Sequence, residues 1–293
     1  MISKLILGTV QLGIDYGINN SSGKPSLAQS FDILETAFDN GLRILDTAEA
    51  YGNSQEVIGE FHKEYPNKEF KVITKLAAKH SVTKESFISN IRKNCEVLGV
   101  KQLHGFMFHN YDSFIQNSEF YEELLKAKKL GLIKFAGISL YTNNEIDDIA
   151  TNFSDFDFIQ IPFNLFDNES KRKEEIEKAR EKQIDIHTRS VFLQGLFFKS
   201  TKDLSEKMKP FEPYLEKLNL LKTECDLTTE EIALNYVLQK EYIDHVLIGV
   251  ENVDQLKSNL TTCNKNNEIP HSVLNNINIL EVNLCFIIEL SFL

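Results

Sequence analysis

The chain has 293 residues, 42% of them hydrophobic and 26% charged, with a net charge of −11. This is the composition of a folded globular protein. The acidic balance argues against nucleic acid and against an anionic membrane surface as partners, because phosphate binding needs clustered lysine and arginine. No stretch reaches the roughly 20 apolar residues that would span a bilayer, so we expect no membrane partner.

Eight short apolar segments alternate with segments of helical periodicity, such as residues 26–41, which end in a glycine. Such apolar runs are typical of strands buried on both faces of a parallel sheet. The alternation predicts the α/β class, and eight repeats favour a (β/α)8 TIM barrel, a single domain over residues 1–293. A doubly wound sheet is the competitor, but its usual glycine-rich loop is missing after the first segment. The segments are residues 5–10, 43–48, 71–76, 105–110, 135–140, 158–163, 185–190 and 245–250.

Four polar residues stand at or just past the C-terminal ends of predicted strands: Asp46, Tyr51, Lys75 and His109. In a barrel of alternating strands and helices these ends converge on one face, and active sites are built there. An acid, a phenol, an amine and an imidazole at one face make a proton-transfer site. Each residue alone is weak support for a function, so the hypothesis depends on their convergence.

Five motifs carry a resemblance to a known enzyme family. They are LGTVQLG at 7–13, DTAEAYG at 46–52, ITKL at 73–76, FHN at 108–110 and GIS at 137–139. In this order the motifs resemble the aldo-keto reductase family, and the resemblance runs from about residue 2 to about residue 260. It implies a (β/α)8 barrel that reduces an aldehyde or ketone to an alcohol with NAD(P)H, with the four polar residues as a catalytic tetrad.

The resemblance also implies a role for each member of the tetrad. Tyr51 donates a proton to the carbonyl oxygen, and the ammonium of Lys75 is expected to lower the pKa of this phenol. Asp46 keeps Lys75 charged and oriented, and His109 positions the substrate oxygen. The nicotinamide cofactor supplies the hydride.

Other positions match the family's cofactor contacts. Gly8, Thr9 and Asp46 lie toward the nicotinamide ribose, Ser139 and Gln160 toward the carboxamide, Arg189 and Ser190 beside the ring, and Gly195, Gly249, Glu251, Gln255 and Asn259 toward the phosphates and adenine.

Three of these positions depart from the family's pattern. Arg189 replaces an aromatic residue that usually stacks on nicotinamide. Glu251 stands where NADP-using relatives often carry a base, and Gln255 where some carry arginine. A carboxylate repels a 2′-phosphate but accepts hydrogen bonds from a ribose hydroxyl. The resemblance thus favours NADP(H), while Glu251 leaves NAD(H) open.

The substrate is less defined. The polar loop at residues 11–25 either lines the substrate pocket with Tyr16 or is an ordinary surface loop, and its polarity suggests a sugar or sugar derivative as the small-molecule carbonyl substrate. The alternative function is a catalytically weak, cofactor-binding regulatory subunit, like the related potassium-channel β subunits. The complete tetrad favours the enzyme, and the sequence leaves monomer and homo-oligomer open.

Two segments break the regular alternation. An insertion near residues 196–225 is either a set of extra helices packed on the barrel or a flap over the cofactor. The atypical apolar tail at 280–293 either packs on the barrel, covers the pocket, mediates association or is the product of a frameshift in the sequence. The charge run at 171–182 is predicted to be a solvated helix face.

Cysteine and histidine spacing gives no sign of a metal site. We expect reduced thiols in a cytoplasmic protein, and we expect the three histidines at 62, 80 and 104 to lie on the surface or in loops. The cysteines are Cys95, Cys225, Cys263 and Cys285.

Overall fold

A closed barrel of eight parallel strands forms the centre of the molecule in a computed structural model that describes residues 1–20, 22–265 and 269–278. The strands are β1 (Leu5–Gly8), β2 (Ile44–Asp46), β3 (Lys71–Leu76), β4 (Leu103–Phe108), β5 (Ile133–Ser139), β6 (Phe158–Pro162), β7 (Asp185–Arg189) and β8 (His245–Gly249). Each pairs with the next along the chain, and β8 closes on β1. The predicted (β/α)8 barrel is confirmed, and every predicted strand segment overlaps an observed strand.

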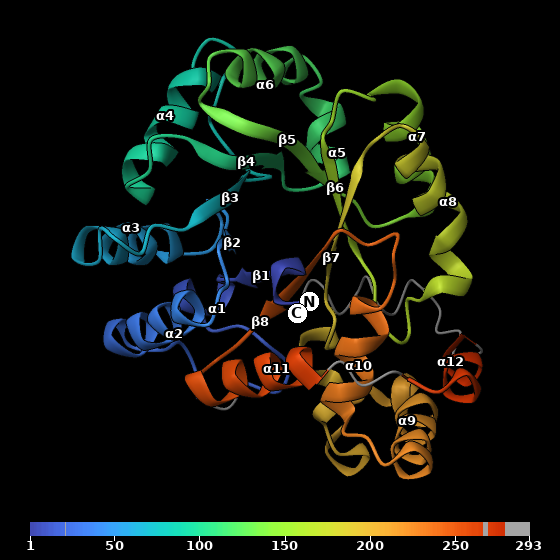
Figure 1. The fold of residues 1–293 in the computed structure, drawn as a ribbon. Helices are drawn as coiled ribbons and strands as arrows, with labels where there is room; N and C mark the ends of the chain where they lie inside the picture. Colours follow the sequence, from blue (N-terminus) through green and yellow to red (C-terminus); the bar gives the residue numbers. More distant parts are fainter. Residues whose placement is uncertain (21, 266–268, 279–293) are drawn as a thin grey trace.

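Helices surround the barrel on its outer side (Figure 1). Local sequence sets several of their ends: at the start of the second helix, Ser26 and Gln29 satisfy each other's backbone N–H groups in a capping box. Gly99, with φ +66°, ends the fourth helix in the left-handed region. The helices are α1 (Val10–Gly13), α2 (Leu27–Asp39), α3 (Ser54–Glu64), α4 (Phe87–Leu98), α5 (Tyr111–Gln116), α6 (Phe120–Lys129), α7 (Asn143–Asn152), α8 (Glu169–Glu181), α9 (Glu212–Cys225), α10 (Thr229–Leu238), α11 (Val253–Lys265) and α12 (His271–Asn278).

Strand periodicity determines what points into the barrel. Side chains alternate between the two faces of a strand, so positions two apart point the same way. One inward layer is apolar, and the next positions along the same strands carry the polar residues singled out in the sequence. The apolar layer consists of Ile6, Ile44, Ile73, Met107, Phe158 and Leu247, and two residues further along these strands stand Gly8, Asp46, Lys75, His109, Gln160 and Gly249.

The ring of Phe158 fills the middle of the barrel because two neighbouring strands carry glycine there. A Cβ atom at Gly137 would lie 2.3 Å from the Phe158 ring, and one at Gly105 would lie 3.2 Å from it. Phe158 also stacks on His187 with ring centroids 4.4 Å apart. A cavity of about 440 Å³ lies beneath this layer, at the N-terminal ends of the strands.

The insertion near residues 196–225 contains short 3-10 helices followed by α9. Phe211, Leu215 and Leu218 are buried in the main core between barrel and helices, and Phe211 stacks with Phe166. The larger part of the insertion therefore consists of extra helices packed on the barrel. The apolar tail at 280–293 lies outside the described residues.

Two polar residues depart from the sequence predictions. The charge run at 171–182 is largely exposed, as predicted, but the side chain of its Arg172 is fully buried. His62 is 6% exposed: its Nδ1 donates to the Leu98 carbonyl at 2.8 Å, and its Nε2 accepts from the Phe70 N–H at 3.1 Å. Both side chains have buried partners, which balance the desolvation of their polar groups.

Cys95, Cys225 and Cys263 are free thiols, and Cys285 lies outside the described residues. Within the described part of the chain, no helix has the length and apolar character needed to cross a membrane.

Candidate active site

A cavity of about 580 Å³ opens at the C-terminal ends of the strands. The whole tetrad and every predicted cofactor residue line it. These residues are Asp46, Tyr51, Lys75, His109, Gly8, Thr9, Ser139, Gln160, Arg189, Ser190, Gly195, Gly249, Glu251, Gln255 and Asn259. The described residues contain no group of three or more histidine, cysteine, aspartate and glutamate side chains placed to hold a metal ion.

Asp46 and Lys75 form a buried ion pair at the base of this cavity, each side chain being at most 3% exposed. The Lys75 ammonium donates to Asp46 Oδ1 and to the Thr47 carbonyl, the latter at 3.1 Å. Gln160 Nε2 donates to the other carboxylate oxygen at 2.8 Å. Both oxygens of Asp46 therefore have buried donors, which compensate for its lost hydration.

Tyr51 and His109 lie beside this pair. The Lys75 ammonium is 5.1 Å from the centre of the Tyr51 ring, and the rings of Tyr51 and His109 meet edge to face at 5.8 Å. Tyr51 follows the end of β2, and His109 follows the end of β4. The four predicted residues are thus brought together by three neighbouring strands.

Burial governs the protonation of the site. It raises the pKa of Tyr51 well above its ordinary value, and the Asp46 carboxylate raises it further. Burial also lowers the pKa of Lys75, against the opposing effect of Asp46. The pKa of Tyr51 is therefore not brought below its ordinary value as expected, because burial of the phenol and the charge of Asp46 outweigh the nearby positive charges. Tyr51 is a neutral phenol at pH 7.

His109 is also neutral at pH 7. Burial, with smaller contributions from the charges of Lys75 and Arg189, lowers its pKa to about 3. A neutral imidazole has one N–H donor and one acceptor nitrogen, and Nδ1 of His109 is buried without a hydrogen-bond partner. The ring can therefore take part in a hydrogen bond inside the cavity without carrying a charge.

Two predicted cofactor residues already have partners within the protein. The Thr9 hydroxyl donates to the Asp46 carbonyl at 2.9 Å and accepts from the Ser54 hydroxyl at 2.8 Å. The side-chain N–H of Gln160 donates to Asp46, as described above, and Gln160 pairs with Ser139 across the strands β5 and β6. These contacts fix the end of β2, so Thr9 and Gln160 also serve to hold Asp46 in place.

The opposite part of the cavity is formed by β8, by the residues that follow it and by the first turns of α11. Glu251 and Gln255 bind each other: Gln255 Oε1 accepts from the Glu251 N–H at 2.8 Å, and its Nε2 donates to Glu251 at 3.3 Å. Burial raises the pKa of Glu251. Asn259, about one turn beyond Gln255 in α11, is 3% exposed.

The residues around Gln11 leave polar atoms free to bind a polar ligand in the cavity. Gly249 leaves room for the Gln11 side chain, since a Cβ atom there would lie 2.7 Å from Gln11 Nε2. Two buried atoms here have no hydrogen-bond partner: Gln11 Oε1 and Arg189 Nη2. Unsatisfied buried polar atoms that line a cavity are what a polar ligand would pair with, so the residues present fit a nicotinamide cofactor. The sequence prediction missed Gln11, although it lies within the LGTVQLG motif.

The loop at residues 11–25 and the start of the insertion meet across this cavity. The Ile18 N–H donates to the Gln194 carbonyl at 2.9 Å, and Tyr16 and Gly195 both line the cavity. Gly195 has φ +88°, and a Cβ atom on it would lie 2.9 Å from the Asn19 Cβ atom. Tyr16 thus lies at the pocket, the first of the two alternatives for this loop. Phe198, at the start of the insertion, lines the cavity too.

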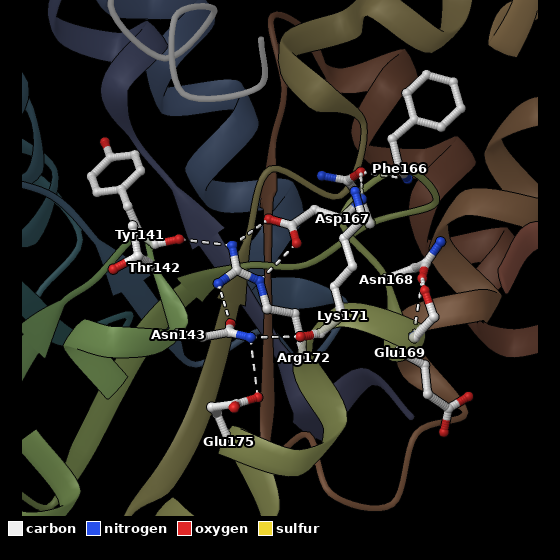
Figure 2. A network of polar contacts seen from close by, with 12 residues as sticks. Tyr141, Thr142, Asn143, Phe166, Asp167, Asn168, Glu169, Lys171, Arg172 and Glu175 are labelled. Atoms are coloured by element: carbon white, nitrogen blue, oxygen red, sulfur yellow. Dashed lines mark hydrogen bonds and ion pairs between the residues drawn. The ribbon is translucent and has the colours of Figure 1, made fainter. Parts of the chain in front are cut away.

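Tyr141, at the rim, also lines the cavity and was not predicted from the sequence. Its backbone is held by a buried network (Figure 2). Arg172 makes two hydrogen bonds to Asp167, both 2.7 Å, one to the Tyr141 carbonyl at 2.7 Å, and one to Asn143. The network joins the β6–α8 and β5–α7 loops and fixes the position of Tyr141.

Comparisons with known proteins agree with this geometry. The family model described as "Aldo/keto reductase family" matches residues 4–281. The chain is 23% identical to the aldo-keto reductase YhdN of Bacillus subtilis (strain 168), covering 87% of this chain and 83% of that protein. It is 25% identical to the chloroplastic pyridoxal reductase of Arabidopsis thaliana, covering 80% and 71%.

The fold is shared with the holo form of aldo-keto reductase AKR11C1 from Bacillus halodurans. That structure superposes with a TM-score of 0.74 at 19% identity, over 95% of this chain and 92% of the other. A family match over nearly the whole chain, together with the closed eight-stranded barrel, decides the assignment: this chain belongs to the aldo/keto reductase family, whose members are NAD(P)-dependent oxidoreductases that act on carbonyl groups.

Proposed function

We propose that this protein reduces an aldehyde or ketone to an alcohol with Tyr51 as the proton donor. The observation that carries the proposal is the convergence of Tyr51, His109 and the Asp46–Lys75 pair at one end of a single cavity. NAD(P)H, when bound, supplies the hydride that adds to the carbonyl carbon. The residues of the chain then have to supply a proton and to orient the carbonyl oxygen.

Tyr51 holds the proton that the first of these tasks needs. Its raised pKa also makes the phenol a weak acid, so the transfer depends on stabilisation of the phenolate as it forms. Its O–H bond breaks as a new O–H bond forms on the carbonyl oxygen, and the phenolate regains a proton from water. Lys75, 5.1 Å from the ring, offsets the negative charge that develops on the phenolate. The neutral His109 holds the carbonyl oxygen by a hydrogen bond.

The cofactor would be held by residues around the rest of the cavity. Ser139, Gln160 and Gln11 would contact the nicotinamide end, and Gly195, Gly249 and the first turn of α11 would lie toward the phosphates. The polar groups of the 11–25 loop support a small polar carbonyl compound, such as a sugar derivative, as substrate. The name of one relative, pyridoxal reductase, supports a small polar carbonyl compound as substrate.

Replacement of Tyr51 by phenylalanine tests the proposal. Fluorescence titration with NADH and NADPH comes first, followed by a screen of aldehydes and ketones with the cofactor that binds more tightly. We expect Tyr51→Phe to lower turnover by about 10²- to 10⁴-fold, the usual contribution of a positioned acid, and to leave cofactor affinity nearly unchanged. More than about a tenth of the wild-type turnover in this variant is too much for a lost general acid and would exclude Tyr51 as proton donor. Cofactor binding without turnover of any carbonyl in the wild type would favour the regulatory subunit.

A further inference from the structure

Arg189 is the residue of the cavity that the proposed chemistry leaves unexplained. It ends β7, and its guanidinium lies over the ring of Tyr141, 4.2 Å from the ring centre. One nitrogen, Nη1, is 3.4 Å from the Ser190 hydroxyl, while Nη2 is buried without a partner. A guanidinium has five donors and stays charged at every physiological pH. A buried donor of this kind without a partner calls for an explanation.

The charge of Arg189 is also uncompensated within the described structure. None of the ion pairs found between described residues includes it, and the nearby carboxylate of Asp46 already has Lys75 and Gln160 on its two oxygens. Of the other three carboxylates that line the cavity, Glu251 binds Gln255, Glu230 accepts from Ser258, and Asp254 is exposed in the first turn of α11. Arg189 as a whole is partly exposed, but its Nη2 is withdrawn from water without a partner, and an anion in the cavity would satisfy this donor and compensate the charge.

The position of Arg189 indicates where such an anion would lie. Its positive charge contributes to the low pKa of His109 and opposes the rise in the pKa of Tyr51. The guanidinium is therefore close to the two groups proposed to hold and protonate the carbonyl oxygen. Glu251 and Gln255, at the proposed phosphate end of the cofactor site, follow β8, the strand paired with β7, and they bind each other.

The residue beneath Arg189 is anchored through its backbone. Tyr141 is fixed through its carbonyl by Arg172, which Asp167 and Asn143 hold in turn (Figure 2). A guanidinium on an aromatic face keeps its planar edge available for hydrogen bonds. Two parallel N–H bonds to one carboxylate or phosphate are the arrangement for which arginine is best suited.

We infer that Arg189 binds a carboxylate or phosphate group of the substrate beside the reacting carbonyl, so that this reductase prefers anionic carbonyl compounds. The inference rests on the proposed carbonyl reduction and adds the substrate class. It also gives a reason for an arginine at a position where the family usually has an aromatic ring. Because the whole chain carries a net charge of −11, a preference for anions has to come from a local site such as this one.

Two matched substrate pairs test the inference: 4-carboxybenzaldehyde against methyl 4-formylbenzoate, and glyceraldehyde 3-phosphate against glyceraldehyde. Within each pair only the charged group differs. We expect kcat/KM of the wild type to favour at least one anionic member by about 10- to 100-fold, the range for a charge-assisted contact. Arg189→Gln should bring that ratio close to one, mainly through KM, and Arg189→Lys should retain part of it. The pair that responds identifies the anion.

The matched control is Lys202→Gln, which removes the same charge from an exposed residue that does not line the cavity. This variant should leave the ratio of kcat/KM between the anionic and the neutral member unchanged in both substrate pairs. Equal use of charged and neutral partners by the wild type would overturn the inference. So would an equal loss on both members in Arg189→Gln, or a loss of NADPH affinity with an unchanged ratio, since Arg189 would then serve the cofactor.

A binding measurement separates this inference from the proposed function. The alcohol product 4-(hydroxymethyl)benzoate is titrated by calorimetry into wild type and Arg189→Gln in the presence of NADP⁺, with glycerol 3-phosphate as the phosphate probe. Binding that is at least about 10-fold weaker in the variant supports the anion site even where no carbonyl is turned over. Equal affinities for both probes would overturn the site even in an active reductase. Thermal unfolding of each variant verifies that it is folded.

Discussion

Lys75 determines the charge balance under the proposed proton donor. Its ammonium neutralises Asp46 and lies below the ring of Tyr51, where burial raises the pKa of the phenol. Removing the ammonium leaves the Asp46 carboxylate buried with Gln160 as its remaining side-chain donor. The phenolate that forms during reduction would then face the negative charge of Asp46 without the ammonium that offsets it, with the charge of Arg189 still opposing it.

We predict that Lys75→Met lowers turnover by about 10²-fold or more and shifts the pH dependence of reduction, and that Asp46→Asn loses activity as well. The profile of kcat against pH, measured for wild type and both variants, decides the question. NADPH titration and thermal unfolding serve as controls for folding and for cofactor binding. A Lys75→Met profile that superimposes on that of the wild type would remove Lys75 from the proton-donor argument.

The pKa of Tyr51 could not be predicted from the sequence. The motifs placed the phenol next to a cation, which by itself favours phenolate. How deeply the ring is buried, and how near Asp46 lies, depend on the packing of three strands and their loops. The identities of the tetrad residues were therefore accessible from the sequence, whereas their electrostatics required the structure.

Among the helices and strands, α8 holds the residue whose burial was least expected, Arg172. Arg172 lies in a run of twelve mostly charged residues that has the pattern of a solvated helix, and its neighbours in the run are largely exposed. One inward position in such a run cannot be recognised from composition, because its partner Asp167 lies before the helix and its other acceptors lie on another loop. The strand pattern, by contrast, was visible in the sequence because eight apolar runs recur regularly.

We predict that Arg172→Met lowers the free energy of unfolding by about 3–5 kcal/mol, since it leaves the Asp167 carboxylate buried and unpaired. The double variant Arg172→Met/Asp167→Asn should recover part of this loss, because the uncompensated charge is then gone. Urea denaturation of the wild type, both single variants and the double variant gives the coupling free energy between Arg172 and Asp167. Strict additivity of the two single effects would contradict the buried pair as the cause.

The segment between β8 and α11 carries the prediction on cofactor choice. Glu251 lines the cavity, and a carboxylate facing a 2′-phosphate weakens NADPH binding. We predict that Glu251→Arg tightens NADPH by about 10-fold, equivalent to ~1.4 kcal/mol, and affects NADH much less. Dissociation constants for both cofactors, in wild type, Glu251→Arg and the neutral Glu251→Gln, test this. An unchanged NADPH/NADH ratio would mean that the side chain does not face the phosphate.

For the whole molecule, the buried imidazole of His187 makes stability depend on pH. It lies within the barrel, 6% exposed, and burial lowers its pKa well below the ordinary value of about 6.5. The unfolded chain takes up a proton as the pH falls through 6.5, while the folded chain does not. Stability is therefore complete above that pH and decreases below it.

We expect this one group to lower the free energy of unfolding by about 2 kcal/mol between pH 7.5 and pH 5, since each pH unit below 6.5 contributes at most ~1.4 kcal/mol. The measurement is urea denaturation at both pH values for wild type and His187→Gln. The variant should be less stable at pH 7.5, because it loses the stacking on Phe158, but its decline toward pH 5 should be smaller. Parallel declines in the two proteins would show that His187 is not the group responsible.

The ring of Phe158, seated against Gly105 and Gly137, has a consequence for the reaction as well as for packing. It separates the cavity at the N-terminal ends of the strands from the layer that holds Asp46 and Lys75. Water and ions that enter from below meet an apolar barrier and do not screen that pair. The apolar ring keeps the space around the ammonium at a low dielectric, so that its field stays strong at Tyr51. The same field extends through the layer, because the charge of Lys75 also contributes to the low pKa of His187, which lines the cavity at the other end of the barrel.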